Sequence, residues 1–301
     1  MGTNTKSYSS SAEKLRALLN SQTTAFLMEA HSGLSARIVE EAGFEGIWAS
    51  GLAISAALGV RDANEASWTQ VLEVVEFMTD STKLPVLVDG DTGYGNFNSV
   101  RRLVQKLCQR NVAGVCLEDK LFPKTNSFIG EGQELADPLE FAGKIKAAKD
   151  SQLNDDFCVV ARVEALIAGK TMAEALQRAD QYYRAGADAI LIHSKKKDGA
   201  EILAFAAQWH RGCPLVIVPT MYYAVPTDEF IKAGIATIIW ANHNLRASMA
   251  SMRNVCRAIQ QSRSLQCVEE GLPAVSDIFD LVDYAELSAA EKTYLPGSAQ
   301  S

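Results

Sequence analysis

Acidic residues at four positions could together hold a metal ion. Asp89 and Asp91 are two residues apart, so an extended backbone would direct both side chains to the same side. Several converging carboxylates repel one another unless a cation joins them, and oxygen ligands of this kind select a hard ion such as Mg²⁺. The predicted metal ligands are Asp62, Asp89, Asp91 and Glu118. The alternative is that these acids cap loops and helices at a solvated rim.

Two further features are suited to binding an anion. Arg162 stands near the end of an apolar run, and a guanidinium group matches phosphate or carboxylate with two parallel hydrogen bonds. Beside a metal site this favours an anion clamp, whereas an ion pair with Glu164 is the structural alternative. Ser50 and Gly51 offer backbone N–H groups where glycine permits close approach, which would form a second anion site.

The segment from Lys120 to Ala136 is long for the connection between a strand and the next helix. Such connections often act as lids over an active site. A lysine ammonium and an asparagine amide, at Lys124 and Asn126, could close over an anionic ligand; an exposed polar turn is the alternative. His193 follows another apolar run, where it either lines the same pocket or binds backbone carbonyl groups.

Short apolar runs supply the scaffold that must bring these residues together. The predicted strands are residues 25–30, 46–50, 85–89, 114–118, 158–163, 189–193, 215–219 and 237–240. Continuous apolar runs of this length suit strands that are buried on both faces, as in a parallel sheet. Segments of helical periodicity alternate with them. The predicted helices are residues 34–42, 69–78, 99–109, 138–149, 172–185, 200–209, 228–233 and 245–262, with Asn98 as the N-cap of the third.

This alternation predicts an α/β fold, namely a (β/α)8 barrel of the TIM type. A doubly wound open sheet is the alternative, but no Gly-x-Gly-x-x-Gly pattern follows the first strand. In a barrel, the ends of the strands meet at one face, and the candidate residues stand at those ends. We expect residues 13–301 to form a single domain that includes a C-terminal helical extension, and the polar residues 1–12 to form a mobile arm.

Composition excludes several classes of function. The 301 residues include 29 Lys and Arg against 36 Asp and Glu, a net charge of -7, which argues against a nucleic-acid partner. No apolar run approaches the roughly 18 residues of a membrane span, and the N-terminus lacks the apolar stretch of a secretory signal. Six scattered cysteines without a Cys-x-x-Cys pair indicate a reducing cytoplasm. We therefore expect a cytoplasmic protein that acts on a small molecule.

Three motifs together resemble the isocitrate lyase / phosphoenolpyruvate mutase superfamily. They are Gly59-Val60-Arg61-Asp62, Asp89-Gly90-Asp91-Thr92-Gly93-Tyr94-Gly95-Asn96 and Glu118-Asp119-Lys120, and the likeness extends over nearly the whole chain. The superfamily fold is an α/β barrel whose last helices are exchanged with a neighbouring subunit. The resemblance therefore implies a homodimer or homotetramer formed by helix exchange.

The predicted lid separates the branches of this superfamily. Its lyases carry a catalytic cysteine in the lid, whereas the aligned stretch here reads Lys124-Thr125-Asn126-Ser127. The Glu-Asp-Lys motif followed by this Asn-Ser pair is similar to the mutase branch, which interconverts phosphoenolpyruvate and phosphonopyruvate. The alternatives are phosphonopyruvate hydrolase, a carbon–carbon lyase or oxaloacetate hydrolase, and a barrel without catalytic activity.

The resemblance also implies a role for each candidate residue. Asp89 would bind Mg²⁺ directly, while Asp62, Asp91 and Glu118 would act mostly through bound water. The implied substrate-binding residues are Ser50, Gly51, Ser127 and Arg162. The implied catalytic residues are Asp62, Lys124, Asn126, Arg162 and His193. A phosphoryl group would pass from oxygen to carbon in a loose, metaphosphate-like state, while the closed lid excludes water.

Overall fold

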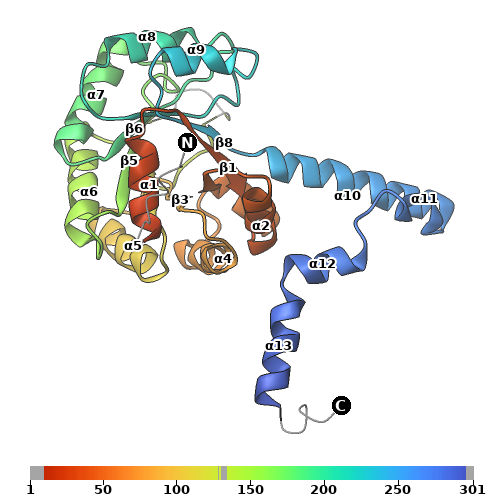
Figure 1. The fold of residues 1–301 in the computed structure, drawn as a ribbon. Coiled ribbons are helices and arrows are strands. Elements are labelled where there is room, and N and C mark those ends of the chain that lie inside the picture. Colours follow the sequence, from red (N-terminus) through yellow and green to blue (C-terminus); the bar gives the residue numbers. More distant parts are fainter. Residues whose placement is uncertain (1–9, 128, 130–133, 296–301) are drawn as a thin grey trace, which may run out of the picture. The chain divides into compact units, whose positions relative to one another are not determined.

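Eight parallel strands form a closed barrel in this computed structural model, which describes residues 10–127, 129 and 134–295 (Figure 1). The strands are β1 Ala25–Ala30, β2 Gly46–Ala49, β3 Val86–Asp89, β4 Gly114–Glu118, β5 Cys158–Val163, β6 Ala189–Ile192, β7 Leu215–Ile217 and β8 Thr237–Trp240. Neighbours in sequence pair in parallel, and β1 pairs with β8 to close the barrel. The predicted barrel is therefore confirmed, and the open sheet is excluded.

The strands are buried on both faces, which explains why their sequences are continuously apolar. In β4, for example, Val115 and Leu117 pack into the layer between the sheet and the helices. Cys116, which lies between them, belongs to a second cluster inside the barrel. Side chains alternate across a strand, so two apolar environments require an unbroken apolar run.

Helices follow the strands and surround the barrel, except for α1, which precedes β1 (Figure 1). They are α1 Ser11–Leu19, α2 Gly33–Glu41, α3 Gly51–Ala57, α4 Trp68–Ser81, α5 Phe97–Gln109, α6 Pro138–Ser151, α7 Met172–Arg184, α8 Ala200–Gln208 and α9 Thr227–Lys232. The sequence analysis did not predict α1 or α3. The expected N-cap of α5 was also wrong: the Asn96 side chain accepts the hydrogen bond from the backbone N–H of Asn98, which lies inside the helix.

The helix α1 includes the last part of the expected N-terminal arm. Residues 1–9 of that arm lie outside the described residues, while Ser10 caps α1 by accepting a hydrogen bond from the Glu13 N–H. Leu15 and Leu19 are fully buried in the cluster inside the barrel. Because Leu15 packs beside Gly114, the first residue of β4, this helix closes the end of the barrel opposite to the strand termini that carry the candidate residues.

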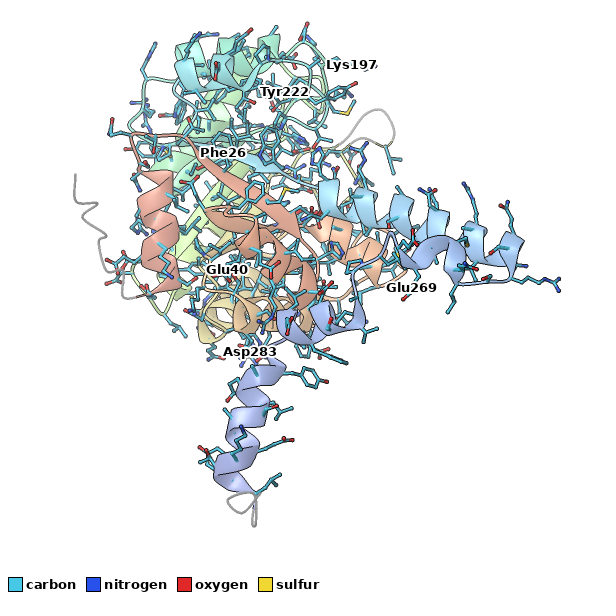
Figure 2. All side chains as sticks on the ribbon, turned by 45° about the vertical axis from the view of Figure 1, so that its right-hand side comes forward. Phe26, Glu40, Lys197, Tyr222, Glu269 and Asp283 are labelled. Carbon is cyan, nitrogen blue, oxygen red and sulfur yellow. The ribbon has the colours of Figure 1, made fainter. Side chains whose placement is uncertain are left out.

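The chain divides into two compact units, residues 1–245 and 246–301. That the extension and the barrel form a single domain stays a prediction. The extension comprises most of α10 His243–Ser262, then α11 Gln266–Glu269, α12 Val275–Leu281 and α13 Tyr284–Tyr294. Asp283 caps α13 at the turn after α12 (Figure 2). No helix in the described part of the chain is both long and apolar enough to span a membrane.

Candidate active site

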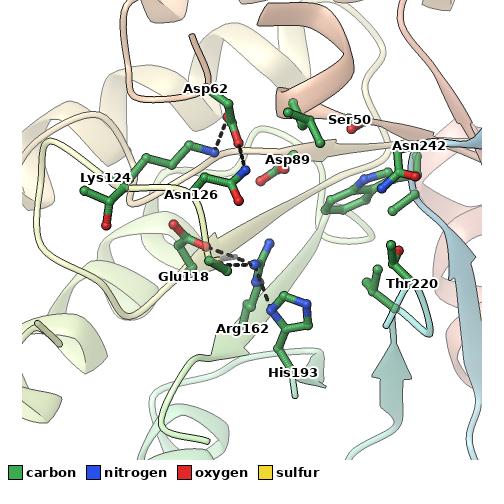
Figure 3. Close-up of a pocket in the computed structure, with 16 residues that line it drawn as sticks. Ser50, Asp62, Asp89, Glu118, Lys124, Asn126, Arg162, His193, Thr220 and Asn242 are labelled. Atoms are coloured by element: carbon green, nitrogen blue, oxygen red, sulfur yellow. Dashed lines mark hydrogen bonds and ion pairs between the residues drawn. The ribbon is translucent and has the colours of Figure 1, made fainter. Parts of the chain in front are cut away.

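One cavity lies at the carboxyl ends of the strands and collects the residues that the sequence singled out (Figure 3). The predicted residues that line it are Ser50, Asp62, Asp89, Glu118, Lys124, Asn126, Ser127, Arg162 and His193. The remaining two candidates, Gly51 and Asp91, contact this lining directly: the Gly51 N–H donates to Asp89, and the Asp91 carboxylate contacts Lys124. The fold therefore brings all the predicted site residues to one place.

The carboxylates of Asp89 and Asp91 do lie together, but not for the reason expected. Asp91 has φ 50°, in the left-handed region, so the backbone is not extended between them. Both carboxylates instead pack against Gly51, where an added Cβ would lie 3.1 Å from Asp89 Oδ2 and 3.2 Å from Asp91 Oδ1. Glycine at this position leaves the space that the two acids occupy.

The expected anion cradle at Ser50 and Gly51 has a different arrangement. The Ser50 N–H donates to the Ala30 carbonyl oxygen at 3.3 Å, and the Gly51 N–H donates to Asp89 Oδ2 at 3.3 Å. The Ser50 hydroxyl accepts from the Ala53 N–H and so caps α3. Both backbone donors therefore have acceptors within the protein, and a role in substrate binding stays a prediction.

A buried lysine from the lid lies among the carboxylates. The Lys124 ammonium is 2.7 Å from Asp62 Oδ1 and also contacts Asp91 Oδ1. Burial opposes the charged form of Lys124, but Asp91, Asp89 and the other acids raise its pKa well above the ordinary value. Burial raises the pKa of Asp91 to about 7. The charges of Asp89 and the other acids add to this shift, and the charge of Lys124 opposes it. Several carboxylates therefore act on the single ammonium group of Lys124.

The donor set fits a hydrated magnesium ion. Within the described residues, no group of three or more His, Cys, Asp or Glu side chains is arranged to hold a metal directly. Mg²⁺, however, usually keeps several waters and binds few carboxylates. Glu118 Oε1 is buried and has no hydrogen-bond partner in the described part of the protein. The hydrogen bonds that Asp89 accepts from the N–H groups of Gly51 and Asp91 are long, at 3.3 and 3.4 Å. A cation with its water shell would satisfy these oxygens.

Arg162 forms an ion pair with Glu164, which was the alternative to an anion clamp, and it also lines the cavity. Its Nε donates to Glu164 Oε1 at 2.6 Å, and its Nη2 donates to Ser127 Oγ at 2.9 Å. A second carboxylate, Glu118 Oε2, lies 3.4 Å from Nη2. Burial would lower the pKa of Arg162, but Glu164 and Glu118 raise it well above the ordinary value. A permanent positive charge is thus held at the wall of the cavity.

His193 stands beside this arginine and contacts the same carboxylate. Its Nδ1 lies 2.7 Å from Glu164 Oε1 and 2.9 Å from Arg162 Nη2. Burial and the Arg162 charge lower the pKa of His193, although Glu164 opposes this. Burial would raise the pKa of Glu164, but Arg162 and His193 lower it well below the ordinary value. Arg162, Glu164 and His193 therefore form one hydrogen-bonded group in which the environment favours the charged forms of Arg162 and Glu164 and the neutral form of His193.

Residues 124–127 of the lid are folded over the cavity. Asn126 Nδ2 donates to Asp62 Oδ2 at 2.7 Å, and both Lys124 and Asn126 point toward this carboxylate (Figure 3). From the opposite side, the fully buried Lys120 donates to the Thr125 carbonyl oxygen and to Ser127 Oγ, each at 2.8 Å. Side chains of both walls thus hold this part of the lid in place.

Three polar residues of the site were missed or undervalued by the sequence analysis. Asn64 binds both the lid and Asp91, and its position two residues after Asp62 was the available signal. Glu164 appeared only as a partner of Arg162. Asp119 is fully buried; its Oδ1 accepts from the Glu164 N–H at 2.8 Å, and its Oδ2 accepts from the Tyr182 hydroxyl at 2.7 Å. It therefore fixes the backbone that carries Glu164.

Comparison with known proteins places this chain in a family. The family model described as phosphoenolpyruvate phosphomutase matches residues 15–260. The chain belongs to the phosphoenolpyruvate phosphomutase family. This confirms the resemblance inferred from the three motifs, and it places the protein in a family of enzymes rather than of catalytically inactive barrels.

Individual relatives agree with this family over almost the full length. A phosphoenolpyruvate phosphomutase from Tetrahymena pyriformis is 58% identical over 294 residues, which cover 96% of this chain and 98% of the relative. The solved structure of phosphoenolpyruvate phosphomutase from Streptomyces platensis subsp. rosaceus has a TM-score of 0.93 at 42% identity, covering 95% and 99% of the two chains. A phosphonopyruvate hydrolase solved with oxalate and Mg²⁺ has a TM-score of 0.90 at 38% identity, covering 95% and 100%.

Proposed function

We propose that the protein interconverts phosphoenolpyruvate and phosphonopyruvate by moving a phosphoryl group between the enol oxygen and C3 of pyruvate enolate. The observation that carries this proposal is the lid. Lys124 and Asn126 are seated over the cavity on Asp62, and the segment 124–127 offers no cysteine to act as a lyase acid. The family membership of the chain supports the same reaction.

Magnesium is the cofactor that we propose for this reaction. Asp89 would hold it, with Asp62, Asp91 and Glu118 acting through bound water. When bound, Mg²⁺ supplies Lewis-acid stabilisation of negative charge on the substrate oxygens. The support is the group of carboxylates gathered at the site and the buried Glu118 oxygen without a hydrogen-bond partner among the described residues. The relative that was solved with Mg²⁺ is a further support.

The phosphoryl group would bind on the arginine side of the cavity. Arg162 donates hydrogen bonds to its oxygens, while Glu164 fixes the orientation of the guanidinium plane through the 2.6 Å bond to Nε. His193, held neutral, adds a donor or acceptor without adding charge. Ser127 Oγ and the Ser50 hydroxyl contact the substrate from the lid and from the end of β2.

The lid would protect the phosphoryl group during transfer. A loose, metaphosphate-like state reacts with any water that reaches it, so the site must be closed before the bond to oxygen breaks. Lys124 and Asn126 place a positive charge and an amide donor near the path between oxygen and carbon. Hydrogen-bond donors that are already in place stabilise the developing charge without reorganisation.

Phosphorus-31 NMR of the purified protein with Mg²⁺ and phosphonopyruvate tests this function. A phosphonate, an enol phosphate and free phosphate give separate signals. Growth of the enol phosphate signal is the expected result. Growth of free phosphate instead would identify a phosphonopyruvate hydrolase and contradict the role of Asn126. An unchanged spectrum would direct attention to the 2-oxo acid substrates of the lyase branch.

We also propose that the protein forms a homodimer or homotetramer by exchange of its C-terminal helices. The support is a set of exposed apolar side chains within the unit 246–301, which a single copy of that unit leaves in water. They include Met252, Leu265, Val275, Ile278, Phe279, Tyr284 and Leu287. Light scattering should give a multiple of the monomer mass for the wild type and a smaller mass for Ile278→Asp. Glu270→Gln, an exposed polar change, should keep the wild-type mass.

A cytoplasmic location is proposed on the state of the cysteines. All six are free in the structure, and unpaired thiols persist where the medium is reducing. Fractionation of the source cells followed by immunodetection would test this location. Recovery outside the cytoplasmic fraction would contradict it.

A further inference from the structure

One asparagine outside the predicted site links the lid to the acidic cluster. Asn64 Oδ1 accepts a hydrogen bond from the backbone N–H of Lys124 at 2.6 Å. Asn64 Nδ2 donates to Asp91 Oδ2 at 2.8 Å. A single side-chain amide therefore spans from the backbone of the lid to one of the proposed metal-binding carboxylates.

The same lysine completes a closed arrangement around Asp91. The Lys124 ammonium contacts Asp91 Oδ1, while Asn64 binds the other oxygen, Oδ2. Lys124 is thus held twice, at its backbone by Asn64 and at its ammonium by Asp91 and Asp62. A shift of the lid at residue 124 would break these contacts together.

The loop that carries Asn64 is built to present it. Asn64 has φ 56°, a left-handed conformation that asparagine tolerates better than most residues. Its neighbours are anchored, since the Arg61 N–H donates to Glu65 Oε2 at 2.9 Å and Ala66 is buried in the core. The amide is therefore presented by a constrained backbone rather than by a free surface loop.

The chemistry of the two bonds requires an amide. The side chain must accept from an N–H on one side and donate to a carboxylate on the other. An aspartate could accept from Lys124, but it would turn a second negative charge toward Asp91. The position therefore calls for a side chain that has both a donor and an acceptor and carries no charge.

We propose that Asn64 is a positioning residue that seats the lid on the acidic cluster, so that Lys124 and Asn126 reach the substrate only when the lid is closed. This inference rests on the proposed mutase function. Without Asn64 the lid stays partly open, and water reaches the phosphoryl group. The expected signs are a lower kcat and a larger fraction of phosphonopyruvate converted to free phosphate.

The test compares Asn64→Gly with Asn111→Gly. Glycine adopts the left-handed conformation without strain, so it removes the side chain and leaves the backbone unstrained. Asn111 is a matched control because it also has a left-handed φ, of 55°, and is exposed on the surface. Two readouts are used with Mg²⁺ present: hydrogen–deuterium exchange of residues 121–127, and phosphorus-31 NMR of turnover.

We expect the amide hydrogens of residues 121–127 to exchange about 10-fold faster in Asn64→Gly than in Asn111→Gly. We expect its kcat to fall about 10- to 100-fold, with a smaller change in KM. Exchange equal to that of the control would overturn the inference, and so would equal turnover. The exchange measurement does not depend on turnover. If the wild type makes no phosphoenolpyruvate, the proposed function is refuted, but the exchange comparison still tests whether Asn64 holds the lid in place.

A second variant separates the two bonds and guards against misfolding of the first. Asn64→Asp keeps the acceptor for the Lys124 N–H and replaces the donor to Asp91 by a charged oxygen. Because the introduced carboxylate and Asp91 carry like charges that repel, we expect exchange at residues 121–127 to be intermediate between the wild type and Asn64→Gly, and kcat to fall at least about 10-fold. Turnover equal to the wild type would overturn the role of the contact with Asp91.

Discussion

The side-chain amide of Asn126 donates a 2.7 Å hydrogen bond to Oδ2 of Asp62, a residue 64 positions earlier in the chain. The Lys124 ammonium binds the other oxygen of the same carboxylate. Asp62 is therefore the common acceptor for both lid side chains. The loop after α3 and the lid after β4 are joined through this carboxylate.

Asn126→Ala should lose most mutase turnover, by about 10²- to 10³-fold, because a donor near the transferring group is removed. Binding of Mg²⁺, measured by calorimetry, should remain. Asn98→Ala, on the exposed surface of α5, should behave as wild type in both measurements. Unchanged turnover of Asn126→Ala would remove this residue from the mechanism.

Asp89→Ala should abolish metal-dependent activity, with a loss of at least about 10³-fold. Asp89 is the last residue of β3 and lines the cavity together with Asp62 and Glu118. Activity should be measured against Mg²⁺ concentration, with the exposed Asp228→Asn as the control. A variant with the wild-type dependence on Mg²⁺ would refute the assignment of Asp89 as a ligand.

Gly51→Ala should weaken Mg²⁺ binding by about 10-fold or more, because the added Cβ crowds Asp89 Oδ2 at 3.1 Å and Asp91 Oδ1 at 3.2 Å. Gly143→Ala is the matched control, since its Cβ would meet nothing within 4 Å. Calorimetric titration with Mg²⁺ compares the two variants. Equal Kd values for both would show that the space beside Gly51 does not matter to the metal.

Glu164→Gln should impair both catalysis and stability. Glu164 is fully buried and pairs with Arg162, so loss of its charge should cost about 3 kcal/mol of unfolding free energy. We also expect KM to rise, since Arg162 loses the partner that orients it. Glu174→Gln is the control: Glu174 pairs with Arg178 but is 36% exposed, so its loss should cost less than about 1 kcal/mol. Urea denaturation and steady-state kinetics measure the two effects.

The pH dependence of stability should contain a contribution from His193. Burial lowers its pKa in the folded protein, so folding favours the neutral imidazole. The stability from this residue is present above its unfolded pKa of about 6.5 and is lost as the pH falls through the lower folded pKa. The wild type should therefore lose more unfolding free energy between about pH 7.5 and about pH 5.5 than His193→Asn.

The exposed His210→Asn is the control for this measurement and should keep the wild-type dependence on pH. Denaturant titrations at the two pH values give the free energies. Equal losses in the wild type and in His193→Asn would contradict the burial of a neutral imidazole at this site.

The sequence by itself located the strands and most of the residues that line the cavity. The strands β1, β4, β5 and β8 have the predicted bounds. Strands buried on both faces need continuous apolar runs, and such runs are visible in the sequence itself. The acidic residues, Arg162 and the lid residues were also found, since the ends of parallel strands must meet at one face of a barrel.

Only the tertiary structure decided how those residues are connected. The left-handed turn at Asp91, the bridge made by Asn64 and the group around Glu164 depend on partners brought together by closure of the barrel. The helix α1 likewise was not predicted, and it is stabilised by burial of Leu15 against strands far along the chain. Periodicity is a local property of the sequence. A hydrogen bond between two residues 64 positions apart, such as that between Asn126 and Asp62, forms only because the folded chain brings these residues together.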